Sequence, residues 1–152
     1  MVYFTKESEL YHFNELISIL RKLDTYFSPP MSSRVDLNEF ARKLDKFGNL
    51  EFACTENDGV IGIIAYYCND HATGSAYGTY LGVLKEYQGK GIASELMKRC
   101  LETCRKSGMK EMILTTEASN MVAKKFYEKF GFDTEKSTTF SGIDKYVMKI
   151  KL

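Results

Sequence analysis

Residues 81–93 combine the features of a phosphate-binding loop. An apolar, strand-like stretch leads into two glycines and then into a helical pattern, in the order Leu-Gly-Val-Leu-Lys-Glu-Tyr-Gln-Gly-Lys-Gly-Ile-Ala. Gly89 and Gly91 have no Cβ, so the backbone N–H groups around them can converge on a ligand. The start of the following helix adds N–H groups without an intrahelical acceptor and the positive end of the helix dipole. Lys90 and Gln88 add side-chain donors, so the segment is predicted to bind phosphate oxygens.

Two common nucleotide-binding motifs are excluded by single positions of this loop. A Walker A loop needs a glycine five residues before its Gly-Lys pair and Ser or Thr after the lysine, where this chain has Leu84 and Gly91. The dinucleotide pattern GxGxxG needs a third glycine, where this chain has Ser94, and a preceding βαβ unit. Taken alone, the loop is equally well interpreted as an ordinary glycine-rich turn between a strand and a helix.

A second segment decides between these interpretations. Residues 88–93, written Gln-x-x-Gly-x-Ala, resemble the acyl-CoA-binding motif of the GCN5-related N-acetyltransferase (GNAT) superfamily, and residues 81–83 resemble the strand end that precedes it. Residues 120–132, with the pattern Asn-x-x-Ala-x-x-x-Tyr-x-x-x-Gly-Phe, are similar to the family's second signature. The two motifs have the family's separation, and the predicted order of elements matches its fold over essentially the whole chain.

The resemblance implies acetyl-CoA as the cosubstrate. The backbone amides of residues 88–93 would hold the pyrophosphate. The family's splay between its fourth and fifth strands, here near 77–84 and 112–116, would let pantetheine amides pair with the backbone of Leu81 and Val83. The Val83 N–H would also polarise the thioester carbonyl. The cofactor-binding residues implied in this way are Leu81, Val83, Gln88, Gly89, Lys90, Gly91, Ile92, Ala93, Asn120 and Tyr127.

Tyr127 stands where the family has its usual general acid, which protonates the departing CoA thiolate. A thiol has a pKa of about 8.5 and a phenol about 10, so this proton transfer is only slightly uphill. No cysteine nucleophile is needed, because the amine attacks the bound thioester directly in a ternary complex. The alternatives are structural: Tyr127 would pack among Phe126 and Phe130, and Asn120 would cap a helix.

The sequence does not identify a general base. Residues 76–84 contain no acidic residue and offer Tyr77 and Tyr80 instead. The titratable residues that follow nearby strands or lie in turns are Glu86, Glu117, Asp70 and His71. A water relayed by a tyrosine, or a backbone carbonyl, is at least as good a candidate as any of them.

The acceptor is the second open question. The family shapes its acceptor groove with the loop between its first two helices, here 26–36, and with its last hairpin, here 134–145. The first loop carries aromatic residues beside Arg34, which suits a small acceptor bearing a carboxylate or phosphate. The predicted function is therefore acetyl transfer to a primary amine of a small molecule. The alternative, favoured by the missing strand carboxylate, is a catalytically weak acyl-CoA-binding sensor or assembly module.

Composition and charge fit this function. A chain of 152 residues predicts a single GNAT domain over 1–152. Lys+Arg 21 against Asp+Glu 20 leaves a net charge of +1, so no global field attracts nucleic acid or an anionic membrane. No apolar run approaches the roughly 20 residues of a membrane span, and residues 1–7 lack the order of a signal peptide. A cytoplasmic protein is expected, with the oligomeric state left open and a homodimer included.

The cysteines predict neither a metal site nor a disulfide framework. Cys54, Cys68, Cys100 and Cys104 form no CxxC pair, and of the two histidines only His71 lies near a cysteine, three residues after Cys68, with no further Cys or His beside that pair. They are interpreted as small buried hydrophobes.

The elements follow from hydrophobic periodicity. Helical spacing of apolar residues from Leu10 to Leu23 predicts a helix over 8–26, and Asp36 with Glu39 caps a second helix that ends at Gly48. A meander of strands follows at 50–55, 60–68 and 76–84, with turns at 57–59 and 69–74. A helix from Gly91 to Gly108, a strand at 112–116, a helix at 121–130 capped by Ser119, and a hairpin of 132–140 with 145–150 complete the chain. The prediction is an α+β fold with a mixed, mostly antiparallel central sheet of about six to seven strands flanked by helices, the acyl-CoA N-acyltransferase fold.

Overall fold

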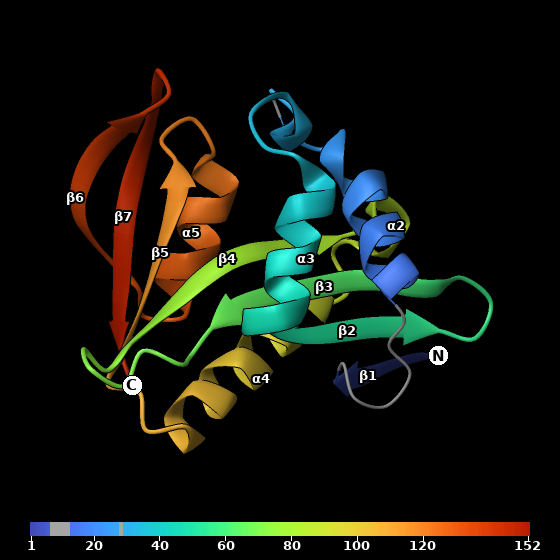
Figure 1. Cartoon of the computed structure of the whole chain (residues 1–152), viewed down its shortest axis with the longest axis horizontal. Helices are drawn as coiled ribbons and strands as arrows, with labels where there is room; N and C mark the ends of the chain where they lie inside the picture. Colours follow the sequence, from blue (N-terminus) through green and yellow to red (C-terminus); the bar gives the residue numbers. More distant parts are fainter. Residues whose placement is uncertain (7–12, 28) are drawn as a thin grey trace. The chain divides into compact units, whose positions relative to one another are not determined.

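The computed structural model describes residues 1–6, 13–27 and 29–152 (Figure 1). In chain order its elements are β1 (Val2–Lys6), α2 (Phe13–Asp24), η1 (Met31–Ser33), α3 (Leu37–Phe47), β2 (Asn49–Thr55), β3 (Gly59–Tyr67), β4 (Ser75–Val83), η2 (Lys85–Tyr87), α4 (Ile92–Lys106), β5 (Glu111–Glu117), α5 (Met121–Lys129), β6 (Asp133–Phe140) and β7 (Ile143–Lys151). The strands form one sheet in the order β1-β2-β3-β4-β5-β7-β6. The predicted α+β fold with a mixed, mostly antiparallel sheet is confirmed.

The chain divides into two compact units, and β4 and α4 contribute to both. The first unit comprises residues 1–66 and 80–102, and the second comprises residues 67–79 and 103–152. Each unit has buried apolar side chains of its own, Leu16, Leu44 and Ile63 in the first and Met112, Phe132 and Met148 in the second.

The first unit contains the predicted meander and one strand that the sequence analysis missed. β2 pairs with β3 in antiparallel register, and their turn ends at Gly59, whose φ of 66° is the left-handed conformation that favours glycine. β1 adds an antiparallel edge strand, from Val2 opposite Thr55 to Lys6 opposite Glu51. The β-forming run Val-Tyr-Phe-Thr was the available signal, but a five-residue edge strand gives only a short alternation pattern.

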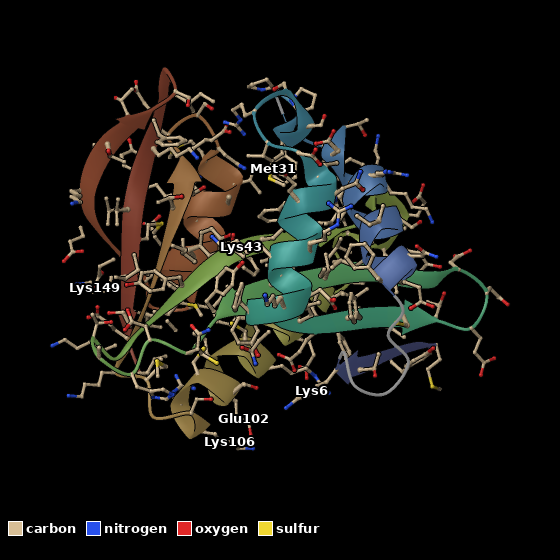
Figure 2. All side chains as sticks on the ribbon, viewed as in Figure 1. Lys6, Met31, Lys43, Glu102, Lys106 and Lys149 are labelled. Atoms are coloured by element: carbon tan, nitrogen blue, oxygen red, sulfur yellow. The ribbon has the colours of Figure 1, made fainter. Side chains whose placement is uncertain are left out.

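The helices of the first unit begin and end at identifiable residues. Asp36 caps α3 as predicted, since its Oδ1 accepts from the N–H groups of Asn38 (2.8 Å) and Glu39 (3.2 Å). α2 ends at Asp24 rather than at residue 26, and residues 8–12 of the predicted helix lie outside the described residues. The Asp24 carboxylate accepts from the backbone N–H of Ser32 (3.0 Å), and this bond holds η1, which begins at Met31, close to the end of α2 (Figure 2).

Close packing of α2 on β4 explains one glycine of the first signature segment. A Cβ on Gly82 would lie 2.7 Å from Cδ1 of Leu23, a side chain that is fully buried in α2. With a larger residue at position 82, the Leu23 side chain or the elements that carry it would have to move.

The second unit holds the parallel crossover and the last hairpin. β4 and β5 pair in parallel over only three residues each, Ser75–Tyr77 with Glu111–Ile113. β7 pairs in antiparallel fashion with the whole length of β5, and β6 pairs with β7 as the predicted hairpin. Between β5 and β6 along the chain, Asn120 rather than Ser119 caps α5: its Oδ1 accepts from the Ala123 N–H at 3.1 Å. The prediction that Ser119 is the N-cap was wrong. The Asn120 N–H donates to the Glu117 carbonyl at 2.9 Å, so residues 117–120 form a tight turn and Ser119 lies within that turn rather than at the helix boundary.

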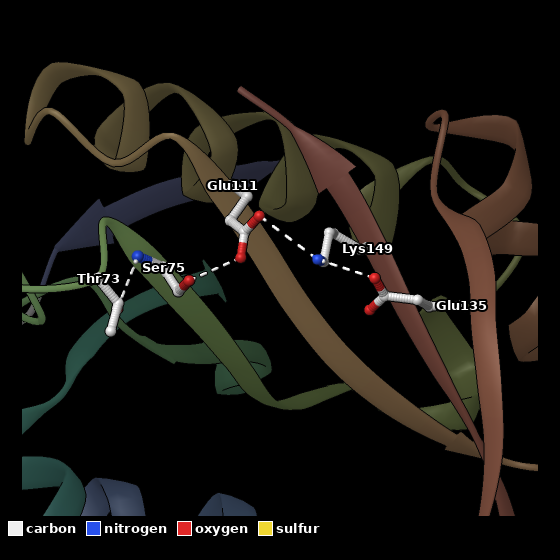
Figure 3. A network of polar contacts seen from close by, with 5 residues as sticks. All are labelled: Thr73, Ser75, Glu111, Glu135 and Lys149. Atoms are coloured by element: carbon white, nitrogen blue, oxygen red, sulfur yellow. Dashed lines mark hydrogen bonds and ion pairs between the residues drawn. The ribbon is translucent and has the colours of Figure 1, made fainter.

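A network of polar contacts joins four neighbouring strands of the second unit (Figure 3). The Ser75 hydroxyl on β4 donates to Glu111 on β5 at 2.7 Å, and Lys149 on β7 bridges Glu111 (3.5 Å) and Glu135 on β6 (2.9 Å). The Ser75 hydroxyl and the Lys149 ammonium lower the pKa of Glu111. Because these side chains are partly exposed, the ion pairs contribute little to stability, but the network fixes the end at which β4 and β5 are paired.

Candidate active site

The predicted phosphate-binding loop has a backbone suited to an anion. Gly89 and Gly91 have φ values of 77° and 79°, and nothing lies within 4 Å of a Cβ placed on either residue. The first N–H of α4 with a backbone acceptor is that of Glu95, which donates to the Gly91 carbonyl at 3.1 Å. Within the described residues, no backbone carbonyl accepts from the N–H groups of residues 89–94. The segment therefore presents a run of available donors at the positive end of a 15-residue helix.

The side chains of the loop divide into supporting and exposed groups. The Gln88 Nε2 donates to the Val83 carbonyl at 3.0 Å, and the Gln88 backbone N–H donates to the Lys85 carbonyl at 3.2 Å. Gln88 thus stabilises the turn, and its predicted contact with the cofactor stays a prediction. Lys90 is exposed, whereas Ile92 is buried and has only its backbone N–H to offer, and Ala93 is half-buried.

The end of β4 has polar backbone groups on two edges. The Leu84 N–H donates to the Ile61 carbonyl of β3 at 2.8 Å. Successive N–H groups of a strand point to opposite edges, so the N–H groups of Val83 and Leu81 point away from β3. Leu81 is half-buried and the Val83 side chain is 6% exposed. This orientation is the one required for backbone pairing with an extended ligand.

Asn120 and Tyr127 lie in the second unit, on α5. Asn120 caps the helix, as the structural alternative predicted. The Tyr127 ring packs edge-on against Phe126 (5.5 Å between centroids) and Phe132 (5.7 Å), and it is half-buried. Phe130 contacts Phe126 (5.2 Å). Tyr127 is therefore only partly accessible to solvent.

The candidates for a general base differ in their surroundings. Tyr80 is 7% exposed between Phe27 and Phe40, and this burial raises its pKa well above the ordinary value, so the phenol stays protonated at neutral pH. Tyr77 lies in the second unit and is 39% exposed. The remaining candidates are surface groups: Glu86 is exposed, Glu117 half-buried, and Asp70 accepts from the Thr73 N–H in a turn. None of them is assigned as the base.

The sequence analysis missed a buried carboxyl group. Glu51 of β2 is 3% exposed and accepts from the Tyr66 hydroxyl at 3.1 Å. Burial raises its pKa. The pKa of Glu51 is also affected by three charged groups, Lys6 of β1 and Arg99 and Glu102 of α4. Figure 2 labels Lys6 and Glu102. The signal was absent from the sequence because Glu51 occupies a position that alternates with Leu50 and Phe52 and therefore looks solvent-facing.

The loop predicted to shape the acceptor groove contacts the start of η2. The Tyr26 hydroxyl accepts from the Lys85 N–H at 2.8 Å, joining residues 59 positions apart. Arg34 follows η1 and is half-buried.

The described part of the chain contains no group of three or more His, Cys, Asp and Glu side chains arranged to hold a metal ion. None of its helices is long and apolar enough to cross a membrane. All four cysteines are buried, as predicted.

The curated proteins that this chain resembles include two that are named N-alpha-acetyltransferases. N-alpha-acetyltransferase 30 of Schizosaccharomyces pombe (strain 972 / ATCC 24843) is 36% identical over 83 residues, which cover 53% of this chain and 55% of the relative. N-alpha-acetyltransferase MAK3 of Arabidopsis thaliana is 35% identical over 94 residues, covering 59% of this chain and 50% of the relative. The chain spans about half the length of these curated relatives.

Structural and family comparisons agree on the fold. The crystal structure of Ard1 from Thermoplasma volcanium superposes with a TM-score of 0.80 at 18% identity, covering 99% of this chain and 97% of that chain. The model of the acetyltransferase (GNAT) family matches residues 14–132, a range that includes both signature segments and ends before the last hairpin. The chain therefore belongs to the acetyltransferase (GNAT) family.

Proposed function

We propose that this protein is an acetyl-CoA-dependent N-acetyltransferase that transfers an acetyl group to a primary amine by direct attack in a ternary complex. The proposal rests on the loop before α4. Gly89 and Gly91 both have left-handed backbone conformations with open space at their Cβ positions. The N–H groups of residues 89–94 donate no hydrogen bond to any described backbone carbonyl. A pyrophosphate fits this cradle because it needs several convergent donors and space that a Cβ would fill.

Residues of β4 and α5 are proposed to bind the rest of the cosubstrate and to assist the reaction. The backbone of Leu81 and Val83, directed away from β3, pairs with the pantetheine amides, and the Val83 N–H stabilises the negative charge that develops on the thioester oxygen. Asn120 contributes its Nδ2 to the same cosubstrate. Tyr127 donates its phenolic proton to the leaving thiolate. Acetyl-CoA supplies an activated thioester, so no metal ion or protein nucleophile takes part.

The acceptor we propose first is the α-amino group of a peptide or protein. Both curated relatives are named N-alpha-acetyltransferases, which supports this acceptor class. The small-molecule amine predicted from the sequence is the second candidate. It is supported by the aromatic residues and the half-buried Arg34 in the loop 26–36, which suit an acceptor with its own anionic group.

An acceptor panel tests the proposal. Release of free CoA thiol from acetyl-CoA is followed with short peptides, with the same peptides blocked at the N-terminus, and with small primary amines that carry a carboxylate or phosphate. We expect acceptor-dependent release with free peptides and none with the blocked controls. Release with small amines alone would replace the peptide by the small-molecule acceptor. Tight binding of acetyl-CoA without acceptor-dependent release would instead identify a binding module.

A further inference from the structure

The short helix η2 connects β4 to the glycine loop and is anchored to a distant turn. The Tyr87 hydroxyl donates a hydrogen bond to the carboxylate of Asp58, which lies 29 residues earlier in the turn between β2 and β3. Both residues belong to the first unit. Tyr87 is the last residue of η2 and stands two positions before Gly89.

The turn that carries Asp58 is itself fixed. The Asp58 N–H donates to Oγ1 of Thr55 at 3.0 Å, and Thr55 is 7% exposed at the end of β2. Gly59 closes the turn in the left-handed conformation. The carboxylate is therefore presented from a hairpin whose backbone is held on both sides of Asp58.

Tyr87 also contacts the loop on its other side. The Lys90 Nζ lies 5.6 Å from the centroid of the Tyr87 ring, within the range of about 6 Å for a cation–π interaction. Lys90 stands between the two left-handed glycines. One tyrosine thus contacts the rigid turn through its hydroxyl and the loop through its ring. The hydrogen bond to Asp58 raises the pKa of Tyr87, which keeps the hydroxyl in its donor form.

The glycines need such a restraint from outside. Apart from the adjacent residues, no described atom lies within 4 Å of a Cβ position on Gly89 or Gly91, so no other side chain packs against that side of either glycine. Glycine loses more conformational freedom on ordering than any other residue, and ligand binding to an unrestrained loop is weakened by that loss. Gln88 holds the start of the loop through its bonds to Val83 and Lys85, and the contacts of the adjacent η2 can add to this order before the ligand arrives.

We propose that Tyr87 and Asp58 are positioning residues that preorganise the phosphate-binding loop: the hydrogen bond fixes η2 to the β2–β3 turn, and the ring holds Lys90 beside the loop amides. This inference rests on the proposed function, because it concerns binding of the phosphates of acetyl-CoA. It adds to that function a role for Asp58, outside the segment 81–93, and for Tyr87, inside that segment but before its Gln-x-x-Gly-x-Ala pattern.

Three variants separate the hydroxyl from the ring. Tyr87→Phe removes the donor and keeps the ring under Lys90, Asp58→Ala removes the acceptor and keeps the backbone of the turn, and Tyr87→Leu removes both contacts. We expect the first two to raise the dissociation constant of acetyl-CoA by about 5–10-fold, and Tyr87→Leu to raise it further. The double variant Tyr87→Phe/Asp58→Ala should bind as weakly as either single variant, because all three lose the same bond.

A donor without phosphates distinguishes positioning from general destabilisation. S-acetylpantetheine has the thioester and pantetheine but no pyrophosphate, so its kcat/KM should be the same for wild type and Tyr87→Phe. With saturating acetyl-CoA, the two proteins should have the same kcat. In the ligand-free protein, amide hydrogen exchange at residues 88–94 should be faster in Tyr87→Phe than in wild type. Tyr3→Phe, which removes a tyrosine hydroxyl from the edge strand β1, is the matched control and should change none of these quantities.

The outcomes that overturn the two proposals differ. Wild-type affinity for acetyl-CoA in Tyr87→Phe and Asp58→Ala, or an equal loss with S-acetylpantetheine, overturns the positioning role and leaves the proposed function intact. Failure of the wild type itself to bind acetyl-CoA overturns the proposed function and this inference together.

Discussion

Side chains of the two signature segments make contacts within the protein as well as being candidates for the ligand. Gln88 holds the Val83 carbonyl, Asn120 caps α5, and Tyr127 packs against Phe126 and Phe132. A substitution at any of these positions therefore changes structure and chemistry at once. Tests of single residues therefore need variants that change either the structural contact or the chemical group, but not both.

Tyr127→Phe keeps the ring contacts and removes the proposed proton donor. We expect kcat to fall by about 10²–10⁴-fold, the usual contribution of a general acid, with little change in KM for acetyl-CoA, because the bond to the thiolate matters most in the transition state. Steady-state kinetics with the best acceptor of the panel measure both constants. Undiminished kcat would mean that the thiolate leaves without help from Tyr127. A large loss of stability would mean that its hydroxyl forms a structural bond.

The buried Glu51 predicts a pH dependence of stability. Burial raises its pKa in the folded state, so the folded protein binds this proton more tightly than the unfolded chain. Its contribution to stability is fully present below the unfolded pKa, about 4.3, and is lost as the pH rises through the folded pKa. Glu51→Gln cannot ionise and still offers an oxygen to the Tyr66 hydroxyl. Relative to wild type, it should become progressively more stable from about pH 4 upward, until the pH exceeds the raised pKa.

Chemical denaturation of both proteins at a series of pH values measures this difference. The other charged groups that act on Glu51, Lys6, Arg99 and Glu102, are unchanged in the variant and largely cancel in the comparison. A difference in unfolding free energy that does not vary with pH would show that Glu51 has the same pKa in both states.

At the scale of elements, the sequence predicted those with strong local signals. The apolar stripe of α4 and its flanking glycines gave the helix to within two residues, observed at Ile92–Lys106. The turn at 57–59 gave the β2–β3 hairpin. β1 was missed because an edge strand of five residues gives only a short hydrophobic pattern. The N-cap of α5 was assigned to the wrong residue because Ser and Asn are both good N-caps and stand next to each other here.

A pair of variants separates the two roles of Asn120. Asn120→Asp keeps the oxygen that caps α5 and loses the Nδ2 donor, whereas Asn120→Ala loses both. We expect the Ala variant to be less stable by about 1 kcal/mol and the Asp variant to be as stable as wild type. Both should bind acetyl-CoA more weakly, because both lack the proposed donor to the cosubstrate. Thermal unfolding and titration calorimetry check the two quantities. Wild-type affinity in Asn120→Asp would leave the residue with capping alone.

At the scale of the molecule, the family was predictable from the sequence, whereas contacts between distant segments were not. Two short motifs with the right separation sufficed for the family. The pairs Asp58–Tyr87 and Tyr26–Lys85 join residues 29 and 59 positions apart, and the burial of Glu51 and Tyr80 depends on which elements cover them. Spacing along the chain carries no signal for such contacts, which arise only when the strands and helices pack.

Binding of acetyl-CoA at the Gly89–Gly91 loop is the central claim, and calorimetric titration of wild type and Gly91→Asp tests it most directly. The aspartate introduces a strained left-handed residue and a negative charge where the phosphates are proposed to lie. Gly108→Asp is the matched control, since Gly108 has a similar φ of 82° and equally open surroundings at the other end of α4. Wild type and Gly108→Asp should bind acetyl-CoA alike, and Gly91→Asp should bind about 100-fold more weakly or not at all. Equal affinity of Gly91→Asp and wild type would contradict the account, because the phosphates would then lie elsewhere.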